Sequence, residues 1–224
     1  MAIDESTIAA ASAGTGGEQP FEAHIGRSPI RDLSPVQPEE RWPAKAFAGE
    51  VIPFAATVFR EGHDLLGVEL VLVDPEGHRS RRRMSPTAPG TDRWRTLTRL
   101  DREGLWRFRV RAYGDDWASW LHVAAIKVPI GQDIELVFSE GLELLGRAGS
   151  GKAVRDAATA LADSTLPPET RLAAAHGTKL RQVIDARPLA SLETMSEQHT
   201  IRVERERSGV GAWYEFFPRS ICAK

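Results

Sequence analysis

The sequence has only one cysteine and lacks a long hydrophobic run, and each of these features excludes a class of protein. Cys222 alone forms neither an internal disulfide nor a multi-cysteine zinc site, so a reducing, cytoplasmic compartment is expected. No stretch reaches the ~18 apolar residues of a membrane-spanning helix. The N-terminal stretch "MAIDESTIAAASAGTGGEQP" carries acids where a secretory signal needs positive charge. We therefore expect a soluble chain without a membrane partner.

An excess of charge of one sign is also lacking. The chain has 29 Lys and Arg against 31 Asp and Glu, which gives a formal net charge of −2. Nucleic-acid-binding domains normally carry a basic patch or stripe. The densest basic run, Arg79–Arg83, is expected to point outward from a strand and to be balanced by nearby acids. We expect no nucleic-acid partner.

No metal-ligand spacing is found among the histidines. None of the six lies three or four residues from another, and no cysteine accompanies them, so neither a metal nor a cofactor is predicted. His63 is flanked by Glu61 and Asp64, which is compatible with an acid–base cluster, although a solvated turn is the favoured interpretation. The six histidines are His24, His63, His78, His122, His176 and His199.

One stretch imitates a phosphate-binding loop. Gly146 to Lys152 fits the spacing G-x-x-x-x-G-K, whose lysine contacts phosphates in nucleotide-binding proteins. Ala153 stands where a Ser or Thr must hold Mg²⁺, and the preceding leucines have helical rather than strand character. The segment is therefore predicted to be a Gly/Ser linker between two helices.

Period-two hydrophobicity dominates the middle of the chain. In "EVIPFAATVFREG", Ile52, Phe54, Ala56 and Val58 fall on one face, and "GVELVLVDPEG" repeats the pattern before a Pro–Gly turn. Further strands are expected in "DRWRTLTRL", "LWRFRVRAYGDD" and "WASWLHVAAIKVP". Short strands separated by turns, without helices between them, indicate an antiparallel sandwich of immunoglobulin type.

The period becomes helical after Pro129. Four short helices are predicted around Leu142–Ala148, Val154–Leu161, Leu172–Ala175 and Leu180–Ile184, and they should pack as a small bundle. Extended character returns in "HTIRVERERS", and "AWYEFF" has the continuous apolar character of a strand buried on both faces.

The tryptophans leave two interpretations open. Trp106, Trp117 and Trp120 are expected to fill the core of the sandwich, and the alternative is an exposed platform that stacks on sugar rings.

Four segments in the correct order closely resemble the N-terminal region of the bacterial α-1,4-glucan:maltose-1-phosphate maltosyltransferases, members of the α-amylase superfamily. They are "RWPAKAFAGEVIPFAATVFREGHD", "GTDRW", "WLHVAAIKVPIG" and "RERSGVGAWYEFFPRS". The resemblance implies an α+β fold, mainly β: an immunoglobulin-like sandwich with an inserted helical bundle, followed by a (β/α)₈ barrel. Trp213–Ser220 resembles the first barrel strand.

The expected division follows from this resemblance. It comprises an extended or disordered arm (1–38), the sandwich (39–130), the helical insert (131–195), a return strand (196–208) and the start of a truncated barrel (209–224). Ile221–Lys224 departs from the family, so a natural truncation, a frameshift and a fragment remain alternatives.

The resemblance also implies a function. The family transfers maltosyl units from maltose 1-phosphate to α-1,4-glucan through an aspartate and a glutamate on later barrel strands. No catalytic, cofactor-binding or metal residue is therefore assigned to this chain, which is expected to be an inactive accessory and homodimerisation region. The predicted helices have alanine-rich faces, which would let helices approach each other closely in that dimer. These alanines are Ala157, Ala158 and Ala173–Ala175. The alternative is a glucan-binding sandwich without catalysis, acting through exposed aromatics such as Trp117 or Trp120.

Overall fold

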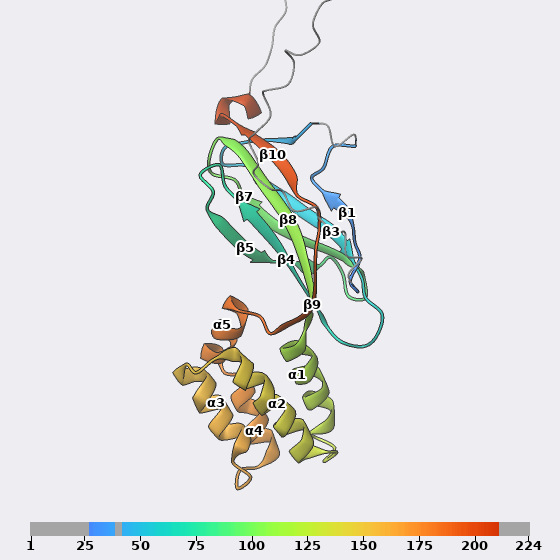
Figure 1. Ribbon diagram of the computed structural model, residues 1–224, viewed down its shortest axis with the longest axis vertical. Coiled ribbons are helices and arrows are strands. Elements are labelled where there is room, and N and C mark those ends of the chain that lie inside the picture. Colours follow the sequence, from blue (N-terminus) through green and yellow to red (C-terminus); the bar gives the residue numbers. More distant parts are fainter. Residues whose placement is uncertain (1–26, 39–41, 211–224) are drawn as a thin grey trace, which may run out of the picture.

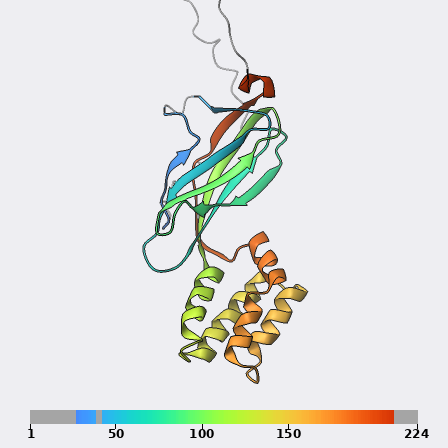
Figure 2. The ribbon, with the colours of Figure 1, turned by 180° about the vertical axis from the view of Figure 1, so that it is seen from behind.

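Two antiparallel β-sheets and a group of helices make up the part of the chain that the structure describes. The computed structural model describes residues 27–38 and 42–210. Figure 1 shows the strands gathered in one half of the molecule and the α-helices in the other. The same division is visible from behind in Figure 2. The protein is thus of mixed α+β class with a larger share of sheet.

The smaller sheet has the strand order β1-β3-β7-β6, and the larger has the order β2-β10-β8-β4-β5, with β9 also paired to β8. All pairs are antiparallel except β2 and β10, which run parallel. The strands are β1 (Ile30–Ser34), β2 (Ala44–Phe47), β3 (Val51–Val58), β4 (Leu66–Val73), β5 (Arg79–Arg83), β6 (Ser85–Pro86), β7 (Arg93–Arg99), β8 (Gly104–Asp115), β9 (Ala190–Met195) and β10 (His199–Glu204).

The two sheets share one hydrophobic core. The alternating residues predicted from the sequence point into it, because successive side chains of a strand lie on opposite faces. Phe54 of β3 and Phe108 of β8 meet edge to face, with their ring centroids 5.2 Å apart. The predicted strands over 50–62, 67–73, 92–100 and 105–116 are confirmed as β3, β4, β7 and β8.

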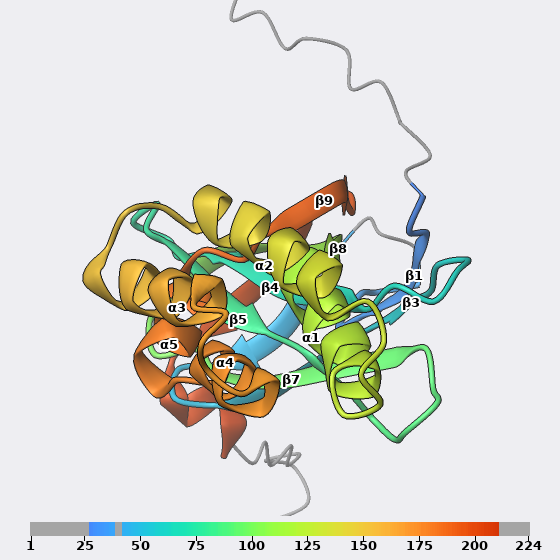
Figure 3. The same cartoon turned by 90° about the horizontal axis from the view of Figure 1, so that it is seen from below.

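Five α-helices form a second, separate core. They are α1 (Asp116–Lys127), α2 (Ile134–Ala148), α3 (Lys152–Ala162), α4 (Pro168–Ala175) and α5 (Thr178–Ala186); the 3₁₀ turn η1 (Glu206–Gly209) follows β10. Figure 3, seen from below, shows the helices side by side in front of the sheets. Ala157 and Ala175 are buried in this core, so their small side chains allow close approach between helices of the same chain.

A buried arginine ties the helices together. Arg171 of α4 donates hydrogen bonds to the carbonyl of Leu161, from Nε at 2.9 Å and from Nη2 at 2.6 Å, near the end of α3. Its Nη1 lies 2.7 Å from Oε1 of Glu135 in the first turn of α2. The guanidinium also covers the ring of Phe138, 3.9 Å from the centroid. One cation therefore links three helices, and its charge is satisfied within them.

The strand expected over Trp117–Pro129 is wrong, because this segment forms α1. Trp117, Trp120, Ala124 and Val128 are buried at spacings of three and four residues, which is the period of a helix rather than of a strand. Helices accordingly begin at Asp116 instead of residue 131. The strand β9 lies within the range that was expected to be helical.

The linker prediction for the Gly-rich stretch is confirmed. Helix α2 ends at Ala148 and α3 begins at Lys152, so the glycines join two helices and follow no strand. The Lys152 ammonium pairs with Asp156 one turn further along α3, at 2.8 Å. Of the arm expected over residues 1–38, residues 1–26 lie outside the described part of the chain, and Ile30–Ser34 forms strand β1 of the smaller sheet. The strand expected in "AWYEFF" also lies outside the described residues.

The transition from sheet to helix occurs at Asp115. Its carboxylate, 2% exposed as a residue, accepts a hydrogen bond from the backbone N–H of Ala118 at 3.0 Å and so caps the N-terminus of α1. The second carboxylate oxygen lies 2.5 Å from Nη2 of Arg83 on β5. One side chain thus ends strand β8, begins the helical part and holds the edge strand of the larger sheet.

We expect Asp115→Ala to lower the free energy of unfolding by about 1–2 kcal/mol, which is the usual cost of removing an N-cap. Asp185→Ala is the matched control. Asp185 is more exposed and lies 3.7 Å from the same Arg83, and its removal is expected to cost less than about 0.5 kcal/mol. Urea titration of both variants measures the difference. A loss for Asp115→Ala no larger than that for Asp185→Ala would contradict the role of Asp115 as a stabilising cap.

Candidate functional site

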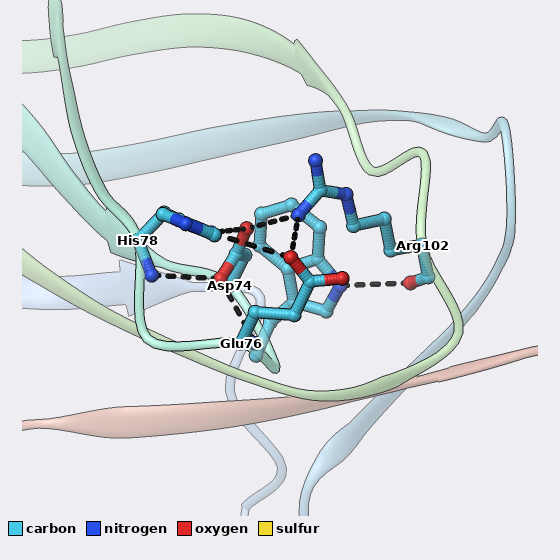
Figure 4. Close-up of polar contacts among 5 residues, drawn as sticks. Asp74, Glu76, His78 and Arg102 are labelled. Atoms are coloured by element: carbon cyan, nitrogen blue, oxygen red, sulfur yellow. Dashed lines mark hydrogen bonds and ion pairs between the residues drawn. The ribbon is translucent and has the colours of Figure 1, made fainter.

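Three acid and histidine side chains meet at the turn between β4 and β5. Oxygen and nitrogen atoms of Asp74, Glu76 and His78 lie within 4.8 Å of one another, which is compatible with metal-ligand spacing (Figure 4). The sequence analysis missed this group because it searched for metal ligands only among histidines and cysteines, and it did not consider the acids beside His78. The signal is present in the sequence as D-x-E-x-H across the "DPEGH" turn.

Arg102, from the turn between β7 and β8, already supplies a cation to this group. Its Nη1 lies 2.8 Å from Asp74 Oδ2 and 2.7 Å from Glu76 Oε2. The backbone carbonyl of Arg102 accepts a hydrogen bond from Nε1 of Trp106 at 2.9 Å, which fixes the turn from the other side. The arrangement suits a contact that joins two hairpins, because both carboxylates pair with the same guanidinium nitrogen.

The ionisation of Asp74 reflects this arrangement. Partial burial would raise the pKa of its carboxyl, but hydrogen bonds from the backbone and ring of His78 and from the backbone of Glu76 outweigh it, and the pKa is lowered below 3.8. Asp74 is therefore ionised at neutral pH.

The basic run Arg79–Arg83 occupies the edge strand β5, and all five of its residues are exposed. The expected balance by nearby acids applies to Arg83, which pairs with Asp115 and Asp185. Within the described part of the chain, no carboxylate lies within 4 Å of Arg79, Arg81 or Arg82. Charged residues on an edge strand oppose pairing with strands of other molecules. This gives the run a structural role.

The outer face of the larger sheet carries a buried ion pair. Arg111 of β8 lies 2.8 Å from Glu69 on β4 and 2.7 Å from Glu193 on β9, and it covers the ring of Tyr113. The Arg111 hydrogen bond lowers the pKa of Glu193. Desolvation raises the pKa of the Tyr113 hydroxyl, which is buried without a hydrogen-bond partner. The group fastens β9 to β8.

The three tryptophans singled out from the sequence are buried. Trp106 lies in the core between the sheets, as expected. Trp117 and Trp120 are each 5% exposed and lie in the helical core, where Trp120 Nε1 donates a 2.7 Å hydrogen bond to the carbonyl of Val137. The interpretation of Trp117 or Trp120 as an exposed sugar platform is therefore wrong, and so is their placement in the sandwich.

The possible acid–base cluster around His63 is a solvated turn. His63 and its neighbours Glu61 and Asp64 are exposed, and Asp64 pairs with Arg60 at 2.8 Å. The favoured interpretation as a turn is confirmed. No acid–base pair is formed there.

A shallow polar groove lies where the start of β2 and the start of β10 meet the segment after β1. We call it the Trp42 groove. It consists of two adjoining hollows that share Val36, Gln37, Glu197 and His199; one has a volume of about 590 Å³ and the other about 100 Å³. Trp42, 66% exposed, and Gln198 line the smaller hollow. Sequence reasoning missed this groove because its two walls are far apart in the chain.

None of the described helices combines the length and hydrophobicity needed to cross a bilayer. Two sheets with five α-helices inserted between β8 and β9 define a domain of the mixed α+β class.

The family of this chain follows from comparison with known proteins. Residues 26–205 match the model for "alpha-1,4-glucan:maltose-1-phosphate maltosyltransferase, domain N/S", and the chain belongs to that family. Two maltosyltransferases of this name from Streptomyces coelicolor are 49% and 43% identical over 88% and 93% of the chain. A relative from Mycobacterium tuberculosis is 35% identical over 87% of the chain. The chain spans about 30% of the length of these relatives.

The lowered pKa of Asp74 predicts a pH-dependent loss in Asp74→Asn. Because the folded pKa lies below the unfolded value, the stabilisation is present above the unfolded pKa and is lost as the pH falls through the folded pKa. We expect Asp74→Asn to destabilise the protein at about pH 7 and much less at about pH 3. Glu76→Gln, whose carboxylate is largely exposed, should have a smaller effect at neutral pH. Urea titrations at both pH values test this, and a pH-independent loss for Asp74→Asn would contradict it.

Proposed function

We propose that this chain is the N-terminal accessory region of a maltosyltransferase that transfers maltosyl units from maltose 1-phosphate to α-1,4-glucan. The match of residues 26–205 to domain N/S of that family carries the proposal. The names of the Streptomyces coelicolor relatives supply both substrates. The region itself positions and assembles the enzyme, and transfer is carried out by residues outside it. Its compartment is the cytoplasm.

The proposal also covers the type of fold. We assign the two sheets to an immunoglobulin-like sandwich, because antiparallel strands with alternating inward residues pack around one shared core. The helices from α1 to α5 form an insertion between β8 and β9. The barrel start expected from residue 209 onward lies almost wholly outside the described residues, which end at 210.

Assembly as a homodimer through the helical part is the second element of the proposal. The alanine faces are already used inside the chain, so the contact needs another surface. Val123 and Ile126 of α1 are exposed three residues apart on one face of the helix, and Ile130, in the turn that follows α1, is also exposed. Leu136 of α2 is also exposed. An exposed apolar face of this kind suits a stable dimer interface, which buries about 1,600 Å² in total.

A second candidate function is binding of α-glucan by the β-sheet part without catalysis. The exposed indole of Trp42 in a polar groove favours it, in place of Trp117 and Trp120. The two functions are compatible, since an accessory region can hold the acceptor of a neighbouring catalytic domain.

The isolated chain is expected to release no phosphate from maltose 1-phosphate in the presence of maltooligosaccharide acceptors. The reason is that a retaining transfer needs two carboxyl groups about 5–5.5 Å apart beside the bound sugar. A phosphate-release assay with one of the Streptomyces coelicolor relatives as positive control measures this. Turnover of the chain clearly above buffer would contradict the assignment as an accessory region.

Ile126→Asp is expected to convert the dimer into a monomer, because it places a charge within the apolar contact. Leu97→Asp is the matched control. Leu97 is similarly exposed on β7, outside the helical part, and its replacement should leave the dimer intact. Size-exclusion chromatography with light scattering at micromolar concentrations gives the masses. A monomeric unmodified chain, or a dimeric Ile126→Asp, would count against this interface.

A further inference from the structure

The outer face of the larger sheet carries a band of basic side chains. Successive side chains of a strand point to opposite faces, so the neighbours of the core residues Leu72, Phe108 and Ile201 point away from the core. Exposed cations occupy such outward positions on four of the strands. They are Arg79 and Arg81 of β5, Arg107 of β8, Arg202 of β10 and Lys45 of β2, and we call them the basic band.

The register of the sheet brings these cations into line. Arg79 pairs with Val73, which pairs in turn with Arg107, so two arginines flank one valine in a single row across three strands. At the other end of the band, Arg202 pairs with Lys45. Directly paired residues lie on the same face of a sheet. Because neighbouring strands are about 4.8 Å apart, the band spans about 19 Å from β5 to β2.

The charge of the basic band is not balanced from within the described ranges 27–38 and 42–210. No carboxylate of these residues lies within 4 Å of any of the five cations. Two acids of the same face, Glu69 and Glu193, are already paired with Arg111, at 2.8 and 2.7 Å. Figure 1 shows the α-helices below this sheet, and none of them covers its strands. The band is therefore an open surface of positive charge on a chain that is slightly acidic as a whole.

Arg111, on the same face of β8 as Arg107, shows how this surface binds a carboxylate. It receives Glu193 from β9 through two hydrogen bonds, with Nε 3.0 Å from Oε2 and Nη2 2.7 Å from Oε1. Paired contacts of this kind are among the strongest that an arginine makes. Opposite Arg107, the neighbouring strand β10 carries Thr200 in place of an acid. A carboxylate supplied by another molecule therefore suits the position beside Arg107.

The composition of the face favours an acidic peptide over other anions. Single-stranded nucleic acids need aromatic side chains for base stacking, and the outward positions of β4, β5, β8 and β10 hold no exposed aromatic residue. Binding to an anionic membrane normally needs apolar anchors as well, and Val71 and Val73 between the arginines are not exposed. A peptide in extended conformation advances about 3.3 Å per residue, so about six residues cross the band.

We propose that the basic band is a docking surface for an extended acidic peptide segment of a partner protein. Carboxylates of the segment pair with the arginines of β5 and β8 at one end and with Arg202 and Lys45 at the other, as clusters of arginine do when they recognise acidic motifs. The segment crosses the face of the sheet and does not extend the sheet at its edge, so the charges of β5 still oppose strand pairing there. Docking is independent of the transfer reaction, and it uses a surface separate from the helical contact proposed for the dimer.

The test is a titration of a fluorescein-labelled peptide of about eight glutamates, long enough to cross the band, with the full chain at low salt, followed by fluorescence anisotropy. The double variant Arg81→Glu/Arg107→Glu should weaken binding at least about tenfold, because two attractive contacts become repulsive. Arg95→Glu/Arg99→Glu is the matched control. Both of its arginines are exposed on β7 of the smaller sheet, and the change in net charge is the same, so it should bind within about twofold of the unmodified chain.

Thermal melting shows whether each variant is folded. Arg81→Gln/Arg107→Gln removes the two charges without reversing them, and it keeps the test valid if the charge-reversed variant unfolds. It should weaken peptide binding by a smaller factor, and the binding of the unmodified chain should fall as salt is added.

Docking at the basic band would be ruled out by an unmodified chain that does not bind the peptide, by undiminished binding of a folded Arg81→Glu/Arg107→Glu variant, or by an equal loss in the control. Tighter binding of a single-stranded oligonucleotide, of inorganic polyphosphate or of phosphatidylserine vesicles, compared at the same total charge, would overturn the choice of an acidic peptide. None of these outcomes affects the proposed accessory role, which is tested by phosphate release and by the mass in solution.

Discussion

The carboxylate of Asp115 is the point on which the two halves of the molecule depend. It ends the longest strand of the larger sheet, caps the first helix and binds Arg83 of the edge strand. Neighbouring residues reinforce the junction: Asp116 accepts from Ser191 at 2.6 Å and pairs with Arg147 of α2 at 2.7 Å. Because β8 passes directly into α1, without a loop, these polar contacts determine how the chain changes from sheet to helix.

The two cores are stabilised in different ways. Between the sheets, alternating aliphatic and aromatic residues bury a continuous apolar layer, in which Phe54 and Phe108 meet. In the helical part the helices are short, and none of them can bury its apolar face alone. There the guanidinium of Arg171 closes the end of α3 and neutralises Glu135, whose pKa its hydrogen bond lowers. A loss of this one side chain would leave a buried carbonyl and a helix end without partners.

The candidate sites share one property: each combines segments that are remote in the chain. Asp74 meets Arg102 across two hairpin turns, and Arg111 meets Glu193 after the whole helical insertion. Both of these sites join segments of the chain, since in each an arginine forms ion pairs with nearby acids. Trp42, Gln37 and Gln198 line a hollow where the start of β2 meets the start of β10.

Local periodicity by itself determined most of the elements. Alternation at Ile52–Val58 and Trp106–Ala112 identified strands and their buried faces, and the motifs identified the family, because both are properties of contiguous residues. Only the tertiary structure decided that Trp117–Lys127 is helical. The segment is compatible with a strand when taken alone, and it is helical because Asp115 caps its start and the helical core buries Trp117 and Trp120. The tertiary structure alone also brought Trp42 beside Gln198, because the pairing of β2 with β10 joins positions more than a hundred residues apart.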